Sequence, residues 1–389
     1  MVKPDCGRLD NKSKASDWEK NALSSVAPLQ RGFDLPTSQL QDGEFPVVYS
    51  NGVLNFHRYA MVEGPGVVTG RSGTIGNVHY LENDFWPHNT TLWVTDFRGN
   101  YPKFVFYLYQ FIDLSKFSTG SGVPTLNRND VHAHTVRIPP LTEQKAIASA
   151  LSDVDALIES LDRLIAKKRD IKQAAMQELL TGKRRLPGFE GAWVTKRLGE
   201  MGNFFKGSGI KKDDTQSGDL PCVRYGEIYT THHNCIREFS SWISREVADG
   251  ATRIRCGDIL FAGSGETKEE IGKCVALVGS EEAFAGGDIV VLRPKEACSA
   301  FLGYYLNTAP INRQKASLGQ GDAIVHISSA ALANIEVSIP ESIEEQNAIA
   351  EVLLSMDIET AALGEKMSKV QNIKQGMMQE LLTGRIRLV

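Results

Sequence analysis

The sequence has few features of a secreted, metal-bound or membrane-embedded protein. Its six cysteines are scattered over 389 residues without a CxxC pair, so neither a disulfide framework nor a zinc ribbon is expected. No apolar run approaches the roughly 18 residues that cross a bilayer. The polar start, MVKPDCGRLDNKSK, also lacks the apolar core of a secretion signal. We therefore expect a cytoplasmic chain without a metal site, although Cys222, His232, His233 and Cys235 are of ligand type.

An excess of positive charge is also missing. The chain has 43 Lys and Arg against 47 Asp and Glu, a formal net charge of −4. Nucleic-acid-binding domains are usually basic overall. Any contact with nucleic acid must therefore come from local basic patches or from basic partners.

Signatures of several enzyme classes are absent or incomplete. There is no GxxxxGK[ST] phosphate loop. There is also no Asn/Asp-Pro-Pro-aromatic tetrapeptide, which an amino-methyltransferase uses to hold the target amine. Two FxGxG segments, residues 205–209 and 261–265, are similar to a methyl-donor loop, but Gly-Ser turns between strands explain them more simply. Residues 266–268 have nuclease-like ExK spacing without a Pro-Asp partner. These features favour a chain that does not catalyse a reaction.

The sequence does contain a long internal repeat. EQKAIASALSDVD at residues 143–155 returns as EQNAIAEVLLSMD at 345–357, and KQAAMQELLTG at 172–182 returns as KQGMMQELLTG at 374–384. One offset of 202 residues (346 − 144) aligns residues 143–186 with 345–388, and 21 of the 44 aligned positions are identical. A period this long indicates a duplicated module of a domain and a helix, rather than a solenoid unit.

Both repeated segments have the pattern of long coiled-coil helices, because apolar residues recur at steps of three and four. This predicted seam contains Ile147, Leu151, Val154, Ile158, Leu161 and Ile165 in the first copy, and Ile349, Leu353, Met356, Thr360, Leu363, Met367, Val370, Met377 and Leu381 in the second. A second row of Ala150, Leu157, Leu164 and Ile171 lies beside the first seam and predicts a wide buried stripe.

Helix length bears on how these segments pack. A helix of about 38 residues spans roughly 55–60 Å, which exceeds what one domain covers. Antiparallel pairing of the two helices, with the globular domains at opposite ends, is therefore favoured over packing on two separate cores. A basic cluster lies in the middle of the first helix and consists of Lys167, Lys168, Arg169 and Lys172. It is consistent either with contact to DNA phosphates or with ion pairs on a solvent-exposed helix face.

The segments that precede the helices are also related to each other. Trp18 opens the first and Trp193 the second, and each closes on Ile-Pro, at residues 138–139 and 339–340. Between them, residues 67–76 match 259–272, residues 88–94 match 287–293, and residues 119–131 match 318–330. The spans from Trp to Pro differ, at 121 residues (139 − 18) and 147 residues (340 − 193). Similar scaffolds with different loops suggest recognition of two different targets.

These features predict an α/β (α+β) fold with a pseudo-two-fold internal repeat. The expected order is a globular domain at 1–139, a long helix at 140–186, a second domain at 187–340 and a second long helix at 341–389. Each helix is expected to begin just after a proline and to stop at a Thr-Gly pair, ending in Gly182 or Gly384.

The chain resembles the specificity subunit of a type I restriction-modification system over nearly its whole length. The resemblance rests on two domains that each end in Ile-Pro and Glu-Gln-x-x-Ile-Ala, and on two long helices ending in Gln-Glu-Leu-Leu-Thr-Gly. It also rests on the Gly-Phe-x-Gly-x-Trp-x-x-x-x-Leu-Gly segment at residues 188–199. The first domain departs from the pattern by its polar N-terminal stretch and by lacking a clear counterpart of KGSGIKKDD at residues 206–214.

The resemblance implies a non-catalytic subunit in which each domain reads one half of an asymmetric, bipartite double-stranded DNA site. The helix pair would set the spacing and dock two methylation subunits, through which restriction subunits join. No cofactor is expected in this chain, whereas S-adenosylmethionine, ATP and Mg²⁺ are expected in the partner subunits. The alternatives are a recognition subunit of a related phage-defence system, a self-sufficient methyltransferase and a structural spacer.

Candidate DNA contacts are polar and basic residues on loops, because such side chains read base edges and bind phosphates. In the first domain they are Arg71, Ser72, Thr74, His88, Asn89, Thr125, Asn127 and Arg128. In the second they are Lys206, Ser208, Lys211, Lys212, Arg224, Tyr225, Ser264, Lys268, Gln320 and His326.

Overall fold

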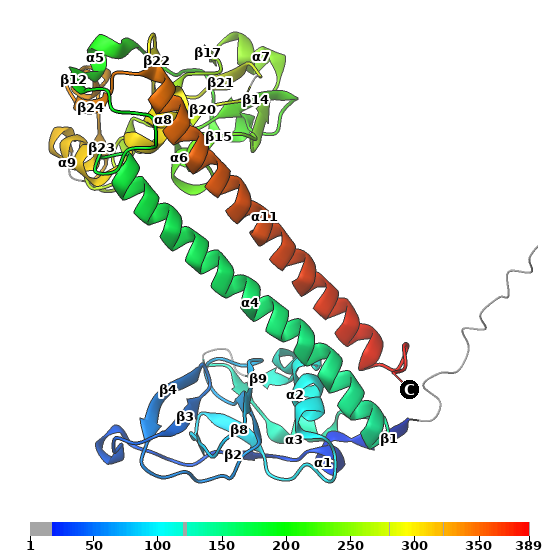
Figure 1. The fold of residues 1–389 in the computed structure, drawn as a ribbon. Helices are drawn as coiled ribbons and strands as arrows, with labels where there is room; N and C mark the ends of the chain where they lie inside the picture. The colour runs from blue at the N-terminus through cyan, green and yellow to red at the C-terminus, as the bar shows by residue number, and fades with distance from the viewer. Residues whose placement is uncertain (1–17, 120–122, 280, 322, 389) are drawn as a thin grey trace, which may run out of the picture. The chain divides into compact units, whose positions relative to one another are not determined.

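The computed structural model describes residues 18–119, 123–279, 281–321 and 323–388, and the polar N-terminal stretch lies outside these ranges. The chain divides into two compact units. Unit 1 comprises residues 1–163 and 364–389, and unit 2 comprises residues 164–363. Each unit therefore contains one globular region and a part of each long helix, labelled α4 and α11 in Figure 1.

The globular region of unit 1 is built on short strands that are antiparallel except for the parallel pair β3 and β7. Its opening strand β1 (Glu19–Ala22) pairs with its closing strand β11 (Thr135–Ile138), so the chain enters and leaves at one place. The main sheet has the order β2-β8-β5-β6 (Leu29–Arg31, Thr91–Val94, Gly66–Gly70, Val78–Leu81). A smaller sheet has the order β4-β3-β7 (Gly52–His57, Phe45–Tyr49, Trp86–Pro87), and β9 (Ser118–Thr119) pairs with β10 (Thr125–Leu126).

Three helices complete this region: α1 (Leu23–Val26), α2 (Pro102–Phe111) and α3 (Arg128–Ala133). Helix α2 begins with proline, whose missing N–H costs nothing in the first turn. Six consecutive residues of α2, from Phe104 to Tyr109, are buried, so the helix is enclosed on all sides. It forms the centre of a core that includes the first turns of α4 and the last residues of α11.

The globular region of unit 2 repeats this framework with more strands. Its opening strand β12 (Trp193–Arg197) pairs with β24 (Glu336–Pro340), and Trp193 lies opposite Pro340. The main sheet has the order β13-β22-β18-β20-β15 (Gly202–Lys206, Ile289–Pro294, Ile259–Ala262, Cys274–Leu277, Asn234–Ile236). The smaller sheet has the order β16-β14-β21-β17 (Ser241–Ile243, Leu220–Val223, Ala283–Ala285, Thr252–Ile254), and β19 (Ser264–Gly265) pairs with β23 (Val325–His326).

Its short helices are α5 (Leu198–Met201), α6 (Tyr225–Thr230), α7 (Arg245–Asp249), α8 (Ser299–Tyr305), α9 (Ala309–Leu318) and α10 (Ser329–Ala333). Strands β15 and β17 and helices α6 and α7 have no counterpart among the described elements of unit 1. These additions account for the longer span between Trp193 and Pro340.

The smaller sheets contain a further repeat. Residues 41–48 (QDGEFPVV) correspond to residues 216–223 (QSGDLPCV), and in both the proline lies opposite an aromatic residue, Pro46 beside Phe56 and Pro221 beside Trp242. A Cβ atom on Gly43 would lie 2.3 Å from the carbonyl oxygen of His57, and one on Gly218 would lie 2.5 Å from that of Ile243. Glycine is therefore required at this turn in both units, because the neighbouring strand passes too close for a side chain.

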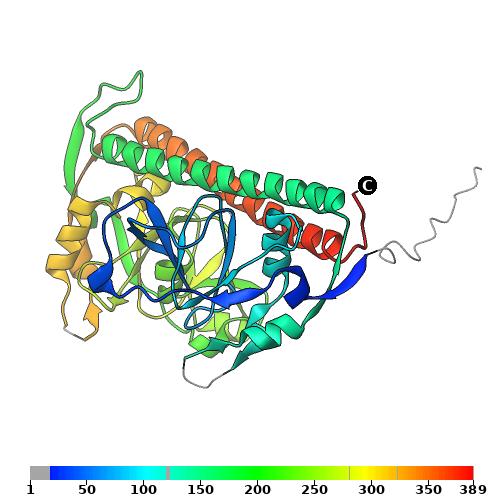
Figure 2. The same ribbon diagram turned by 90° about the horizontal axis from the view of Figure 1, so that it is seen from below.

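The two long helices are α4 (Leu141–Leu179) and α11 (Ile343–Leu381), each of 39 residues. Within each unit their segments run side by side (Figure 1 and Figure 2). In unit 2, Lys168 pairs with Glu359 at 2.7 Å, and Lys172 pairs with Asp357. One number rises as the other falls, so the segments are antiparallel. In unit 1, Asp155 pairs with Lys374 at 2.6 Å, and Glu143 pairs with Arg387. Again one residue number rises as the other falls, so these segments are antiparallel as well.

The predicted seam is confirmed by its burial. Leu151 and Leu353 are fully buried, Leu161 and Ile165 are 4% exposed, and Val370 is 9% exposed. The prediction of a wide buried stripe is wrong, because Leu157, Leu164 and Ile171 are 42%, 39% and 44% exposed. A helix in a two-helix pair buries a narrow face, so the second apolar row remains at the surface.

The repeated Glu-Gln pair explains how each long helix is joined to its domain. Gln144 donates to the carbonyl of Pro139 and accepts from the backbone N–H of Tyr101, at 2.9 and 2.8 Å. Gln346 makes the equivalent bonds with Pro340 and Cys298, at 2.8 and 2.9 Å. Both glutamines are buried, so they satisfy backbone groups that water cannot reach.

The adjacent glutamates hold the residues that follow the opposite helix. In unit 1, Arg387 donates to Glu143 at 2.6 Å and lies over the ring of Trp18. In unit 2, Arg185 binds Glu345 through two guanidinium nitrogens. Positions 185 and 387 differ by the same 202 residues as positions 143 and 345, so the repeat extends to individual contacts.

The long helices lie between the expected prolines and the expected Thr-Gly pairs and are shorter than the segments 140–186 and 341–389. Helix α4 begins directly after Pro140, and α11 begins three residues after Pro340. The helices end at Leu179 and Leu381, and Gly182 and Gly384 follow with φ of 69° and 71°, the left-handed conformation of a C-terminal cap. Neither these two nor any other helix in the described part of the chain is long and apolar enough to span a membrane.

Candidate nucleic-acid interface

In unit 1 the structure brings together the loop after β5 and the strand β10. Ser72 bridges to Thr125, the N–H of Leu126 donates to the carbonyl of Arg71 at 2.8 Å, and the N–H of Gly73 donates to Pro124 at 3.1 Å. Three of the predicted contact residues, Arg71, Ser72 and Thr125, therefore share one surface, although more than 50 residues separate the segments.

The loop after β7 lies against this surface. The Nε of Arg71 donates to the carbonyl of Asn89 at 3.1 Å, and Asn89 bonds through its amide to Asp34. The ring of His88 lies 4.3 Å from that of Tyr49, and its Nδ1 is 3.0 Å from the hydroxyl of Thr90. Burial lowers the pKa of His88, which favours a neutral ring able to donate at one nitrogen and accept at the other.

The remaining predicted residues of unit 1 have different settings. Asn127 caps helix α3 by accepting from the N–H of Asn129 at 3.0 Å, so its side chain has a structural role. Arg128 is exposed at the first position of that helix, and Thr74 is exposed in the turn after β5.

In unit 2 the equivalent surface is the ribbon of β19 and β23. Ser264 lies opposite His326, and the hydroxyl of Ser264 is 2.9 Å from His326 Nδ1. Gln320 exchanges two backbone hydrogen bonds with His326, at 2.9 and 2.8 Å. Ser264 is only 4% exposed, so its hydroxyl orients the exposed His326 ring and cannot itself meet a large ligand. The three predicted residues form one cluster in which Ser264 is a positioning residue.

Two hollows border this ribbon. One of about 240 Å³ is lined by Lys206, Gln320 and His326. The other, of about 570 Å³, is lined by Tyr225, Ser264 and residues of the loop that carries the exposed Lys268. Predicted residues from four separate segments therefore meet around β19 and β23.

Four predicted residues of unit 2 lie in other settings. The hydroxyl of Ser208 bonds to that of Thr252 at 3.0 Å, beside β17. Lys211 and Lys212 are exposed at the start of a 3₁₀ turn. Arg224 precedes helix α6, and its backbone N–H donates to Glu227 at 2.8 Å. The contacts of these residues do not join them to the ribbon.

The structure adds residues that the sequence did not indicate. Tyr229 lines the larger hollow, and its hydroxyl donates to the carbonyls of Ser264 and Glu270, at 3.2 and 3.3 Å. Ile324 is 60% exposed at the same hollow. The spacing of Tyr225 and Tyr229, four residues apart on a helix, was the available signal, because such residues share a face.

The two glycine-rich FxGxG segments are packed against backbone. A Cβ atom on Gly207 would lie 2.1 Å from the carbonyl oxygen of Gly286, and one on Gly263 would lie 2.9 Å from that of Asp288. Close passage of the connection between β21 and β22 therefore accounts for Gly207 and Gly263. Within the described ranges, no three His, Cys, Asp or Glu side chains gather in a way that could hold a metal ion.

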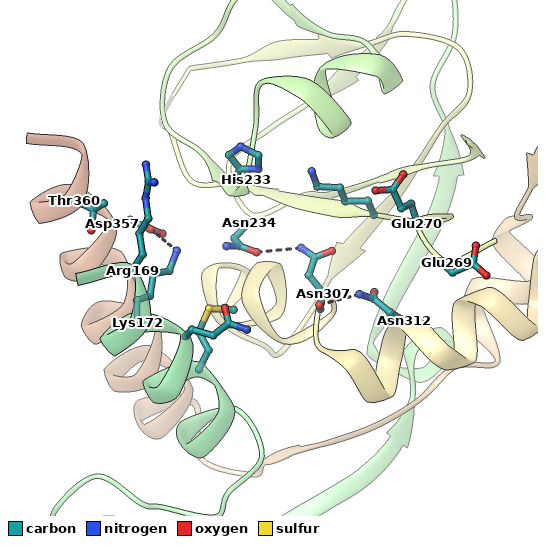
Figure 3. Close-up of a pocket in the computed structure, with 13 residues that line it drawn as sticks. Arg169, Lys172, His233, Asn234, Glu269, Glu270, Asn307, Asn312, Asp357 and Thr360 are labelled. Carbon is teal, nitrogen blue, oxygen red and sulfur yellow. Dashed lines mark hydrogen bonds and ion pairs between the residues drawn. The ribbon is translucent and has the colours of Figure 1, made fainter. Parts of the chain in front are cut away.

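The mid-helix basic cluster takes part mainly in helix pairing. Lys168 and Lys172 bind carboxylates of α11, and Lys172 is only 18% exposed. Arg169 and Lys172 line a hollow of about 540 Å³ in unit 2, together with His233 and Asn307 of the globular region (Figure 3). Burial lowers the pKa of His233, which favours its neutral form there.

Each unit presents a candidate recognition surface built on the same framework, and each globular region is joined to the paired helices. These features define a binding protein with two related modules. The chain belongs to the family of type I restriction modification DNA specificity domains, whose model matches residues 15–167 and 190–372.

Comparisons with individual proteins agree with this family assignment. The type I restriction enzyme MjaVIII specificity subunit of Methanocaldococcus jannaschii is 24% identical over 294 residues, which are 71% of this chain and 67% of that protein. The crystal structure of the type I restriction-modification system S subunit from M. genitalium aligns with a TM-score of 0.67 at 16% identity, covering 97% of this chain and 98% of that one. A structure that describes complex assembly and conformational transition of the type I R-M system aligns with a TM-score of 0.54 at 17% identity, covering 95% of this chain and 98% of that one. At these identities the structural likenesses establish the fold.

Proposed function

We propose that this chain is the DNA-recognition subunit of a type I restriction-modification complex and that it does not itself catalyse a reaction. Each globular region binds one half of an asymmetric, bipartite site in double-stranded DNA. The paired helices set the separation of the halves and dock two methylation subunits, through which restriction subunits join the complex. S-adenosylmethionine, ATP and Mg²⁺ act in those partners.

The observation that carries this proposal is one framework bearing different side chains. The bridge of Ser72 and Thr125 in unit 1 corresponds to that of Ser264 and His326 in unit 2. The framework repeats, whereas the groups it presents differ in size and in hydrogen-bonding capacity. Recognition of two different base sequences by two copies of one scaffold requires a shared framework with different side chains.

The exposed apolar row of α4 supports docking of the methylation subunits. Leu164 and Ile171 of unit 2 are seven residues apart, so they share one helix face. Their side chains are 39% and 44% exposed. Apolar residues repeated on an exposed helix face are typical of a surface that a partner covers.

The direct test is methylome sequencing of cells that carry this chain with its methylation subunits. The proposal expects one motif of two specified halves separated by an unspecified gap. Replacing residues 18–138 with the matching region of a relative should change one half only. A motif without a gap, or a replacement that alters both halves, would contradict the proposal.

A recognition subunit of a related phage-defence system remains an alternative, and the genes beside this one would distinguish it. A self-sufficient methyltransferase is a second alternative. It predicts that the isolated chain crosslinks to radiolabelled S-adenosylmethionine under ultraviolet light, whereas the proposed subunit should not.

A further inference from the structure

One carboxylate in unit 1 joins three elements. The hydroxyl of Tyr107 in α2 donates to Oδ2 of Asp155 in α4 at 2.7 Å and lies 3.1 Å from the hydroxyl of Ser152 on the same helix. The Nζ of Lys374 in α11 lies 2.6 Å from Oδ1 of the same carboxylate and 5.6 Å from the centre of the Tyr107 ring. The globular region and both long helices therefore meet at Asp155.

Unit 2 contains the same triad with the two helices exchanged. The hydroxyl of Tyr304 in α8 donates to Oδ2 of Asp357 in α11, at 2.5 Å. Lys172 of α4 binds Oδ1 of that carboxylate and lies 5.4 Å from the centre of the Tyr304 ring. Figure 3 shows Lys172 and Asp357 on the helices beside the globular region. Two independent copies of one arrangement, in regions whose loops differ, point to a function common to both.

The triads lie next to the apolar core that each globular region shares with the helices. A hollow of about 540 Å³ lies beside the triad of unit 2, between the helices and the globular region. In unit 1 a hollow of about 460 Å³ is lined by His79 and Gln110 of the globular region and by Met378 of α11, the counterpart of Met176 at the hollow of unit 2. Each globular region shares an apolar core with the ends of the helices, and Asp155 and Asp357 each lie four residues beyond a leucine of that core, Leu151 and Leu353. A charged hydrogen bond has a narrow geometry, so the triad adds a directional contact to the non-directional apolar packing.

We propose that the Tyr–Asp–Lys triads are positioning groups that fix the angle of each globular region on the helix pair of its own unit. They thereby restrict the gap length that the complex accepts between the two halves of its site. This inference rests on the proposed function, and it assigns Tyr107 and Tyr304 a role in specificity without contact with DNA.

The chain offers a matched control for each tyrosine. Tyr305 is also buried, but its hydroxyl accepts from the N–H of Ser338 at 2.9 Å within the globular region. Tyr109 likewise donates to Ala27 at 2.6 Å within the globular region of unit 1. Tyr305→Phe and Tyr109→Phe each remove one buried hydrogen bond without touching the helices, so they reproduce a general loss of stability.

The first experiment measures methylation by the complex on duplexes whose gap is the natural one or is one base pair longer or shorter. Tyr304→Phe and Tyr107→Phe should each lower the preference for the natural gap by about 3- to 10-fold, up to the equivalent of one hydrogen bond. Tyr305→Phe and Tyr109→Phe should leave the preference unchanged. Unchanged preference in Tyr304→Phe and Tyr107→Phe, or equal loss in the controls, would overturn the inference.

The second experiment needs no DNA. Spin labels at the exposed positions Ser329 and Ser355, both in unit 2, report the distance between the globular region and α11. Tyr304→Phe should broaden the distance distribution, and Tyr305→Phe should not. Broadening without a change in gap preference would overturn the role in specificity. If the parental complex methylates no specific site, the proposed function fails, while this distance measurement still decides whether the triad fixes the angle.

Discussion

Two leucines one helical turn apart provide a test of the helix seam. Leu161 is 4% exposed, whereas Leu157 on the same helix is 42% exposed. Leu→Ala removes about three carbon groups, or about 2.4 kcal/mol of transfer free energy at full burial, and the cavity adds to this. We expect a loss of about 3 kcal/mol for Leu161→Ala. We expect about 1 kcal/mol for Leu157→Ala, because less of its surface leaves water on folding.

Thermal melts of the two variants measure this difference. At about 2–4 °C per kcal/mol for a unit of this size, Leu161→Ala should lower the melting temperature by roughly 6–12 °C and Leu157→Ala by roughly 2–4 °C. In the complex, Leu161→Ala should reduce methylation at both half-sites without altering their bases. Equal melting temperatures in the two variants would refute the assignment of Leu161 to the seam.

Three further predictions concern the site, the spacer and pH. Arg71→Ala or Lys268→Ala should weaken recognition of one half-site by about 1–3 kcal/mol in a methylation assay on half-site variants, and the melting temperature should not change. A lower melting temperature with unchanged half-site preference would show that the residue has a structural role. Four residues inserted within 181–186 should lengthen the unspecified gap in the methylome and leave both half-sites intact; altered bases would contradict a spacer role. Burial lowers the pKa of His232, so the folded state resists its protonation, and stability should fall as pH drops below about 6.5. His232→Gln should reduce the difference between melts at about pH 7.5 and pH 5.5, and an undiminished difference would place the effect elsewhere.

The long helices could be predicted from sequence because their pattern is local and periodic. Leu151 and Leu353 are buried as the steps of three and four required. The same pattern gave the wrong outcome for Leu157 and Ile171, because periodicity identifies an apolar face but not what covers it. Within this chain that face is open to solvent.

The candidate site was predicted at the level of loops rather than of side chains. The matching islands pair the segment after β5 with that after β18, and in the structure each of these segments bridges to a later strand, Ser72 to Thr125 and Ser264 to His326. The roles of Ser264 and Asn127 could not be inferred, since each depends on a hydrogen-bond partner formed on folding. The repeat of residues 41–48 and 216–223 was missed because its offset, 175 residues (216 − 41), differs from that of the helices.

The division of the chain has a consequence for how it is synthesised. Unit 2 is one continuous segment, residues 164–363, whereas unit 1 needs residues from both ends of the chain. The core of unit 1 includes Leu381 and Leu382, and Glu143 receives Arg387 from a segment 244 residues later. Domains that are continuous in sequence usually fold in the order in which they leave the ribosome. Here the globular region of unit 1 emerges earlier but must wait for Leu381, Leu382 and Arg387 to be translated, so unit 2 can reach its native state before unit 1 does.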